Sequence, residues 1–177
     1  MTWTLDTAHS SFAFSVKHMV VATVRGRFTD FAVDADIDTD DLTKSKATVT
    51  VDIASVDTGD SGRDTHLRSA DFFHHEEHPQ MTFVSKRIES KGGNDYRLVG
   101  DLTIRDVTKE VTLDGEVNGP VKDPWGNERI GITGEGKINR KDFGLNWNAL
   151  LEAGGAVVAD TVKLDVDVEL IQAAAQG

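Results

Sequence analysis

The strongest structural signal in the chain lies in Val162-Lys163-Leu164-Asp165-Val166-Asp167-Val168-Glu169-Leu170, where apolar and charged residues alternate strictly. Such alternation is typical of a β-strand with one buried face, because successive side chains of a strand point to opposite sides of its sheet. Seven other runs show the same period, namely residues 11–18, 31–37, 49–53, 81–83, 96–104, 111–117 and 130–138. The sequence therefore predicts eight strands.

The links between these strands favour antiparallel pairing. Residues 91–95 form a short hairpin loop and residues 118–120 end another strand, whereas parallel neighbours need crossovers of about a dozen residues or more. Residues 57–80 are the exception, and residues 64–71 within them suit a short helix in which Asp64 and Arg68 are spaced to pair at i,i+4. We predict an all-β fold, an eight-stranded antiparallel barrel with a short helical excursion around residues 60–75, spanning residues 1–177 as one domain. A two-sheet sandwich is the alternative that periodicity leaves open.

The composition limits the classes of function. With 38% apolar residues, a chain of 177 residues can bury a core of its own. The net charge of −11 argues against nucleic acid and anionic membrane surfaces as partners. The absence of cysteine excludes thiol catalysis and thiolate metal sites. The sequence shows no signal-peptide pattern and no apolar run of about 18 residues, so we expect a soluble, cytoplasmic protein without stable membrane insertion.

The apolar phase of the strands predicts an interior with room for a ligand, because an eight-stranded barrel is just wide enough to be filled by side chains or to hold one small molecule. Small residues stand at inward positions where leucine or isoleucine would fill space: Ala35, Gly100, Gly134 and Gly136. The alternative is that these glycines only bend the barrel at its corners. The predicted lining on the strands consists of Phe12, Phe14, Val16, His18, Phe31, Val33, Val51, Met81, Phe83, Leu102, Ile132 and Val166.

The excursion between the strands predicts a lid. Phe72 and Phe73 follow the short helix and are expected to lie over one end of the barrel as ligand contacts, with Gly59 and Gly62 as hinge residues. The alternative is that both rings are core plugs. The charged residues here are expected to tie the helix to the barrel through ion pairs and hydrogen bonds: Arg63, Asp64, His66, Arg68 and Asp71. In the functional alternative, Arg63 or Arg68 binds a diphosphate headgroup, since a guanidinium binds phosphate bidentately.

Other local motifs suggest different chemistry but lack its requirements. Residues 131–137 match G-x-x-x-x-G-K, yet Ile138 stands where a phosphate loop needs Ser or Thr, and no helix follows. Residues 74–78, His-His-Glu-Glu-His, lack the Glu that zincins place directly after the first His, so we expect a solvated loop without a metal. The aspartates of residues 34–40 are the solvated face of a strand rather than a calcium loop. With no local set of acid, base and nucleophile, we expect no catalytic residues and no cofactor.

Several blocks along the chain resemble the YceI-like family and follow the family's order. They are Asp6-x-x-His9-Ser10, Phe14-x-Val16-Lys17-His18, Val24-x-Gly26-x-Phe28, Arg63-Asp64-x-His66-Leu67-Arg68-Ser69-x-Asp71-Phe72-Phe73, Pro79, Phe83-x-Ser85, Gly100-x-Leu102-Thr103-Ile104-x-x-Val107-Thr108-Lys109 and Asn139-Arg140-x-Asp142-Phe143-Gly144. The resemblance implies a lipocalin-like barrel that binds long isoprenoid lipids, has no enzymatic activity and often forms homodimers. The chain departs from relatives by starting at the barrel motif, where many carry a secretory signal, and by His74, where relatives usually have a small acidic or amide residue.

These observations lead to one functional hypothesis and three alternatives. The hypothesis is that the barrel interior binds a long-chain isoprenoid lipid of polyprenyl or quinone type, and that the protein is a soluble carrier or sequestering protein. The first alternative changes the ligand to a fatty-acid-like chain, and the second is a filled barrel that acts as a scaffold for a partner. The third is a metal-dependent hydrolase that uses His66, His74, His75 and His78.

Overall fold

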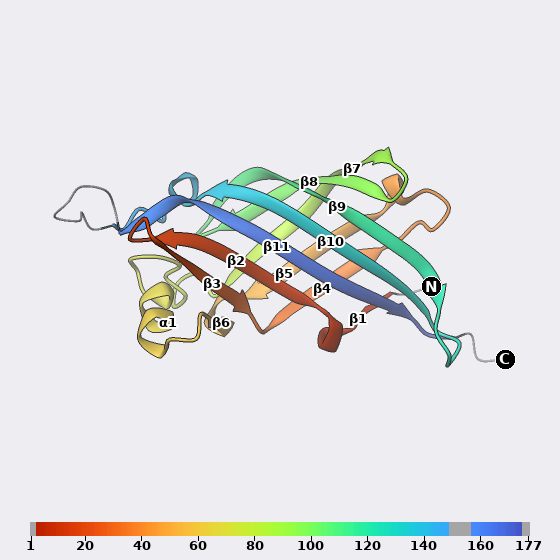
Figure 1. Cartoon of the computed structure of the whole chain (residues 1–177), viewed down its shortest axis with the longest axis horizontal. Coiled ribbons are helices and arrows are strands. Elements are labelled where there is room, and N and C mark those ends of the chain that lie inside the picture. The colour runs from red at the N-terminus through yellow and green to blue at the C-terminus, as the bar shows by residue number, and fades with distance from the viewer. Residues whose placement is uncertain (1–2, 149–156, 175–177) are drawn as a thin grey trace.

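The computed structural model describes residues 3–148 and 157–174, and it shows one long antiparallel sheet curled around its own apolar face (Figure 1). The strands are β1 (Thr4–Leu5), β2 (Ser11–His18), β3 (Ala22–Phe28), β4 (Phe31–Asp36), β5 (Lys46–Asp52), β6 (Val56–Asp57), β7 (Gln80–Gly92), β8 (Asp95–Ile104), β9 (Val107–Lys122), β10 (Glu128–Asn139) and β11 (Val158–Gln172). The helices are α1 (Ser61–Arg68) and the 3-10 turns η1 (Thr7–His9), η2 (Leu42–Lys44), η3 (Ile53–Ser55) and η4 (Arg140–Phe143). Among the residues described, no helix has the length and apolar character needed to cross a membrane.

The sheet follows the order β4-β5-β7-β8-β9-β10-β11-β2-β3-β6, with β1 added to β11. This continuous sheet confirms the all-β antiparallel fold class and rules out the two-sheet sandwich. Within the described ranges no ladder joins β4 to β3 or β6, so the ring of backbone hydrogen bonds is not complete. Side chains bridge the opening: the Phe12 ring of β2 and the Phe31 ring of β4 pack with centroids 4.5 Å apart.

The eight predicted strands correspond to β2, β4, β5 and β7 to β11, while β3 and the two-residue β1 and β6 were missed. Strand β3 does not show the apolar alternation of the other strands. Gly26, between Val24 and Phe28, takes the central inward-facing position. Gly26 pairs with Phe14 of β2, and a Cβ at Gly26 would overlap the Phe14 ring. The aromatic ring of the neighbouring strand therefore fills the space that the glycine leaves.

The same arrangement corrects the expectation that inward glycines leave room for a ligand. At Gly100 the Phe83 ring occupies the position of a Cβ, and at Gly136 the Leu113 side chain comes within 2.7 Å of it. Gly134 also faces Leu113, at 3.6 Å. These three glycines do not border the cavity described below, whereas Ala35 does. The glycines thus permit close packing along the curled sheet.

The core is distributed along the barrel axis. Trp3, Ile130 and Leu170 belong to one buried cluster, and Trp3 is 4% exposed. A second cluster gathers around Phe143 and Phe72, and a third around Phe28 and Val51. The N- and C-terminal residues lie at one end of the barrel and α1 at the other (Figure 1).

Hydrogen bonds fix α1 to the chain that precedes it. Asp60 caps the helix by accepting from the Arg63 amide at 2.9 Å. Asp64 is buried and accepts from the Thr58 amide at 2.9 Å and from the Thr58 hydroxyl at 2.5 Å. The predicted pair of Asp64 with Arg68 is wrong, because the Asp64 carboxylate turns toward Thr58 instead.

Close packing between β9 and β10 gives a test of the curl. A Cβ at Gly115 would overlap the Thr133 carbonyl oxygen, which is backbone and cannot rotate away, whereas a Cβ at Gly131 meets open space. We expect Gly115→Ala to lower the free energy of unfolding by about 1–3 kcal/mol and Gly131→Ala to leave it nearly unchanged. Denaturant unfolding of both variants measures the difference; equal stabilities would contradict this packing.

Candidate functional site

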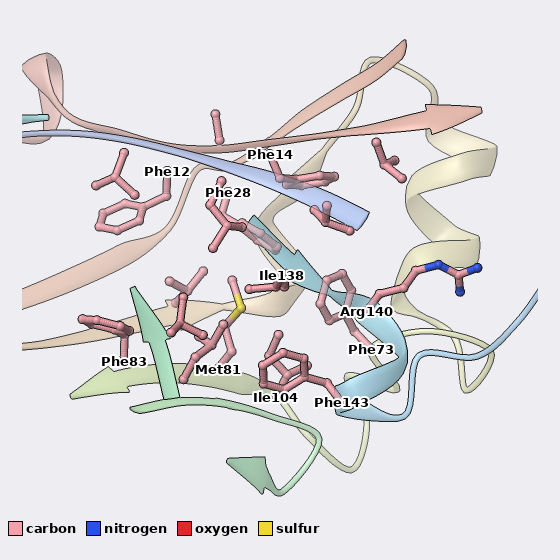
Figure 2. A pocket seen from close by; sticks show the side chains of 18 of the residues that line it. Phe12, Phe14, Phe28, Phe73, Met81, Phe83, Ile104, Ile138, Arg140 and Phe143 are labelled. Atoms are coloured by element: carbon pink, nitrogen blue, oxygen red, sulfur yellow. The ribbon is translucent and has the colours of Figure 1, made fainter. Parts of the chain in front are cut away.

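The curled sheet encloses one large cavity of about 620 Å³. This volume falls within the range of about 300–1,000 Å³ typical of small-molecule sites. Its wall is almost entirely aliphatic and aromatic, and the side chains point into it from β2, β3, β7, β8, β10 and η4 (Figure 2). The cavity is therefore suited to an apolar molecule.

All of the residues predicted to line a ligand site border this cavity except Phe31. Those on the wall are Phe12, Phe14, Val16, His18, Val33, Val51, Phe72, Phe73, Met81, Phe83, Leu102, Ile132 and Val166. Phe31 instead packs its ring against Phe12 at the junction of the sheet edges. Contact of these residues with a ligand stays a prediction.

Sequence reasoning missed several wall residues. Ile138, Leu164 and Val168 border the cavity and stand on the same apolar phase as the residues named in the sequence, so that signal was present. Arg140 and Trp147 lie outside the alternating runs and gave no signal of this kind.

Polar groups gather at the end of the cavity that holds α1. His66 borders the cavity, and its Nε2 lies 2.8 Å from Asp71 Oδ2. The imidazole packs edge-on against Trp147, with ring centroids 4.6 Å apart, and against Phe72, at 5.1 Å. A carboxylate on one side and two aromatic rings on the other thus hold His66 in one orientation.

Arg140 is a buried cation on this wall, with an exposed fraction of 4%. Its guanidinium donates to four backbone carbonyls, those of Leu145 (2.5 Å), Trp147 (2.8 Å), Ala159 (2.8 Å) and Val158 (3.2 Å). Burial lowers the pKa of Arg140 because a low-dielectric site disfavours the charged form. Arg140 thus ties the segment after η4, at Leu145 and Trp147, to the start of β11 and shapes the cavity end.

The two arginines considered for a headgroup differ in position. Arg63 borders the cavity, and its guanidinium donates to the Thr58 hydroxyl and carbonyl, both at 2.8 Å. Arg68 is not on the wall; it reaches the Ala54 carbonyl and the Thr65 hydroxyl at 3.4 Å each. Of the expected ion pairs and hydrogen bonds, hydrogen bonds connect Arg63 and Asp64 to Thr58 and Arg68 to Ala54.

The histidines of the hydrolase alternative do not converge on one place. His66 is on the cavity wall, and His75 Nδ1 lies 3.1 Å from the Arg68 carbonyl oxygen. His74 and His78 do not border the cavity and meet edge to face with ring centroids 5.9 Å apart, and His74 Nδ1 is 3.8 Å from Glu77 Oε2. In the part of the chain described here, the four histidines therefore form no shared catalytic centre.

A second group of metal-type ligands is already occupied by an arginine. Asp6, His9 and Glu169 lie together, and Arg129 Nη1 lies 3.1 Å from Asp6 and 2.6 Å from Glu169. The hydrogen bonds that Arg129 donates to Glu169 and Asp123 raise the pKa of its guanidinium. The guanidinium supplies the positive charge here, so this cluster is structural.

Arg140 allows a direct test of how the cavity end is built. We expect Arg140→Met to lower the free energy of unfolding by at least about 3 kcal/mol, because it leaves several buried carbonyls without donors. Lys141→Met is the matched control, since Lys141 is half exposed and contacts Asp160 at 3.3 Å. Thermal unfolding compares the two variants; equal melting temperatures would show that the carbonyls find other donors.

Comparisons with known proteins agree with this architecture. Residues 3–170 match the YceI-like domain. A UPF0312 protein of Staphylococcus epidermidis is 43% identical over 165 residues, covering 93% of this chain and 94% of the relative. A UPF0312 protein of Staphylococcus aureus is 40% identical, covering 94% and 95%.

Solved structures show the same fold. BcnA of Burkholderia cenocepacia superposes with a TM-score of 0.80 at 28% identity, covering 93% of this chain and 98% of that one. The YCEI protein of Campylobacter jejuni gives 0.77 at 34% identity, covering 89% and 90%. A polyisoprenoid binding domain from Saccharophagus degradans gives 0.67 at 18% identity, covering 96% and 98%, which shows likeness of fold alone.

Proposed function

The chain belongs to the YceI-like family, whose fold is that of binding proteins rather than of known enzymes, and from this premise we propose that it binds a long-chain isoprenoid lipid. The ligand is of polyprenyl or quinone type and occupies the barrel cavity. The protein acts as a carrier or sequestering protein and catalyses no reaction. The observation that carries the proposal is the apolar wall of the 620 Å³ cavity.

The energetics of the cavity support a lipid tail. At about 0.8 kcal/mol per buried CH₂, each five-carbon isoprene unit gains roughly 4 kcal/mol on leaving water. The tail therefore needs no charged anchor. A bilayer offers the tail an equally apolar environment, however, so transfer from membrane to cavity is near neutral. Discrimination between lipids must come from the shape of the cavity and from groups that meet the headgroup.

The α1 end is the best place for a headgroup. His18, Arg63, His66 and Arg140 border the cavity and supply imidazole and guanidinium groups there. The opposite end is packed around Trp3. A lipid whose tail points toward Trp3 and whose headgroup lies near α1 matches both ends of the cavity. Arg63 remains the arginine available for headgroup contact, because Arg68 is off the wall.

Extraction of the purified protein with organic solvent, followed by mass spectrometry, identifies the ligand. An isoprenoid supports the proposal, a fatty acid supports the alternative ligand, and no lipid points to a filled scaffold. We expect Val49→Trp to reduce recovered lipid at least tenfold, because Val49 borders the cavity and the indole occupies tail volume. Thr48→Trp, on the exposed face of β5, is the control and keeps its lipid; circular dichroism verifies that both variants fold.

The two adjacent phenylalanines after α1 have different surroundings. Phe72 is 6% exposed and packs against Trp147 at 5.5 Å. Phe73 is half-buried and packs its ring against Phe28 at 5.9 Å across the cavity. Arg105 Nη1 donates to the Phe72 carbonyl at 3.0 Å, which anchors this segment. We infer that Phe73 covers the route of ligand entry, while Phe72 belongs to the core.

Phe73→Ala is expected to speed ligand release with a modest loss of stability, because its ring covers the cavity rather than filling the core. Phe143→Ala is the comparison, since Phe143 is 1% exposed and its loss costs about 3–5 kcal/mol. Release of a bound quinone, followed by recovery of tryptophan fluorescence, measures exchange. A Phe73→Ala variant that is as destabilised as Phe143→Ala and releases lipid at the normal rate would show that Phe73 is a core plug.

A further inference from the structure

The tip of the β2–β3 hairpin exposes three consecutive aliphatic side chains. Met19, Val20 and Val21 are 46%, 68% and 88% exposed. Met19 and Val20 also adopt positive φ angles, 53° and 67°. This backbone region is unfavourable for a β-branched residue such as Val20, and hairpin loops normally place Asn, Asp or Gly at such positions. Neither solvation nor turn preference explains these residues, which points to a surface that covers them.

The charge of this hairpin is opposite to that of the whole protein. Residues 10–29 contain Lys17, Arg25 and Arg27 and no acidic residue, in a chain of net charge −11. All three basic side chains are exposed, on the outer face of β2 and β3. Lys163 of β11 lies beside Ser15 and adds a further cation.

Acidic side chains of neighbouring strands border this region. Asp165 of β11 lies beside Ala13, Asp160 lies 3.3 Å from Lys141, and Asp57 lies 3.9 Å from Arg27. Lys17 is the basic residue nearest the aliphatic tip, and Arg25 and Lys163 follow farther along the outer face, on either side of Ser15. Such a surface complements a bilayer that contains anionic lipids, because aliphatic groups enter the headgroup region while cations attract the lipid phosphates.

The hairpin tip also lies at the α1 end of the cavity (Figure 1). The Met19 amide donates to the Val157 carbonyl at 2.8 Å, and Val157 and His18 both border the cavity. Insertion of the tip into a bilayer surface would thus bring the lipid-binding end of the protein to the membrane.

We propose that the β2–β3 hairpin is a membrane-docking element that seats the α1 end of the cavity on bilayers containing anionic lipids. The proposal rests on the proposed lipid-binding function, because the use of docking is to give the cavity access to membrane lipids. It also restricts the conclusion drawn from net charge: the molecule as a whole is acidic, but this surface is basic.

The opposite end of the barrel provides an internal control. The β9–β10 hairpin also exposes apolar groups, with Val121 62% and Trp125 77% exposed. This hairpin carries Lys122 and Glu128, and its Asp123 is paired with Arg129 at 2.9 Å, so it has no excess of basic charge. Neither Val121 nor Trp125 borders the cavity. A purely hydrophobic attraction would use either end, whereas the proposed mechanism uses the β2–β3 tip.

Vesicle flotation tests the docking surface. The purified protein is floated with phosphatidylcholine vesicles that contain either no phosphatidylglycerol or about 30 mol% of it, which gives a negative surface potential. We expect binding to the anionic vesicles that weakens at high salt, because screening reduces the attraction of the basic residues. Val20→Asp/Val21→Asp should weaken binding at least tenfold, and Lys17→Glu/Arg25→Glu should remove the dependence on phosphatidylglycerol. Val121→Asp/Trp125→Asp should bind as the unaltered protein does.

Two results would overturn the proposal. In the first, the unaltered protein floats with neither kind of vesicle, which would indicate that a protein partner covers the tip. In the second, only the Val121→Asp/Trp125→Asp variant loses flotation. Binding of a short-chain quinone in detergent, without vesicles, is measured separately by tryptophan quenching. The Val20→Asp/Val21→Asp variant should keep this binding, since neither residue borders the cavity. Failure of the unaltered protein to bind quinone would contradict the proposed function. The vesicle experiment reports on docking alone.

Discussion

Burial of one apolar sheet face is the constraint on which the structure depends. The sheet order runs through almost all strands in a single path, so the sheet must curl until its apolar face meets itself. Tight curling brings neighbouring strands close, and glycines meet large side chains where that happens, as Gly26 meets Phe14 and Gly100 meets Phe83. The curl is too wide for the inward side chains to fill the centre, and the cavity of about 620 Å³ is the result.

The two ends of the barrel are built differently, and this difference gives the cavity a direction. At one end Trp3 packs into a cluster of strand residues. At the other end the wall consists of α1 and connecting segments held by guanidinium groups on backbone carbonyls, with Arg140 and Arg105 as the main examples. Such segments can shift without breaking the ladder between strands, which favours ligand entry at the α1 end.

The sequence was sufficient to predict the fold class because alternation reports directly on which face of a strand is buried. The prediction from sequence was wrong where a residue of another strand determines the packing. Gly26 interrupts the apolar pattern of β3, so that strand was missed, and a ring from another strand fills the space at Gly100. The apolar wall followed the same phase and was largely predictable. Arg140 was not, because its carbonyl partners at residues 145–159 come together only in three dimensions. The expected Asp64–Arg68 pair was wrong for a similar reason. Helical spacing alone does not reveal that Thr58 lies close to Asp64 and takes up its carboxylate.

A lipid-binding cavity also raises a kinetic difficulty that the hairpin tip addresses. The equilibrium free energy of moving a tail between two apolar environments is near zero. A tail that crosses water, however, is exposed to solvent at a cost of roughly 4 kcal/mol per isoprene unit. A few units exposed at once already give a barrier that free diffusion passes very slowly. Aliphatic residues at the β2–β3 tip, beside basic side chains and next to the cavity wall at His18, would let the tail pass from bilayer to barrel with little exposure to water. If the proposed docking holds, the acidic surface elsewhere on the molecule would favour release, and the basic β2–β3 hairpin would set the orientation in which the protein meets a membrane.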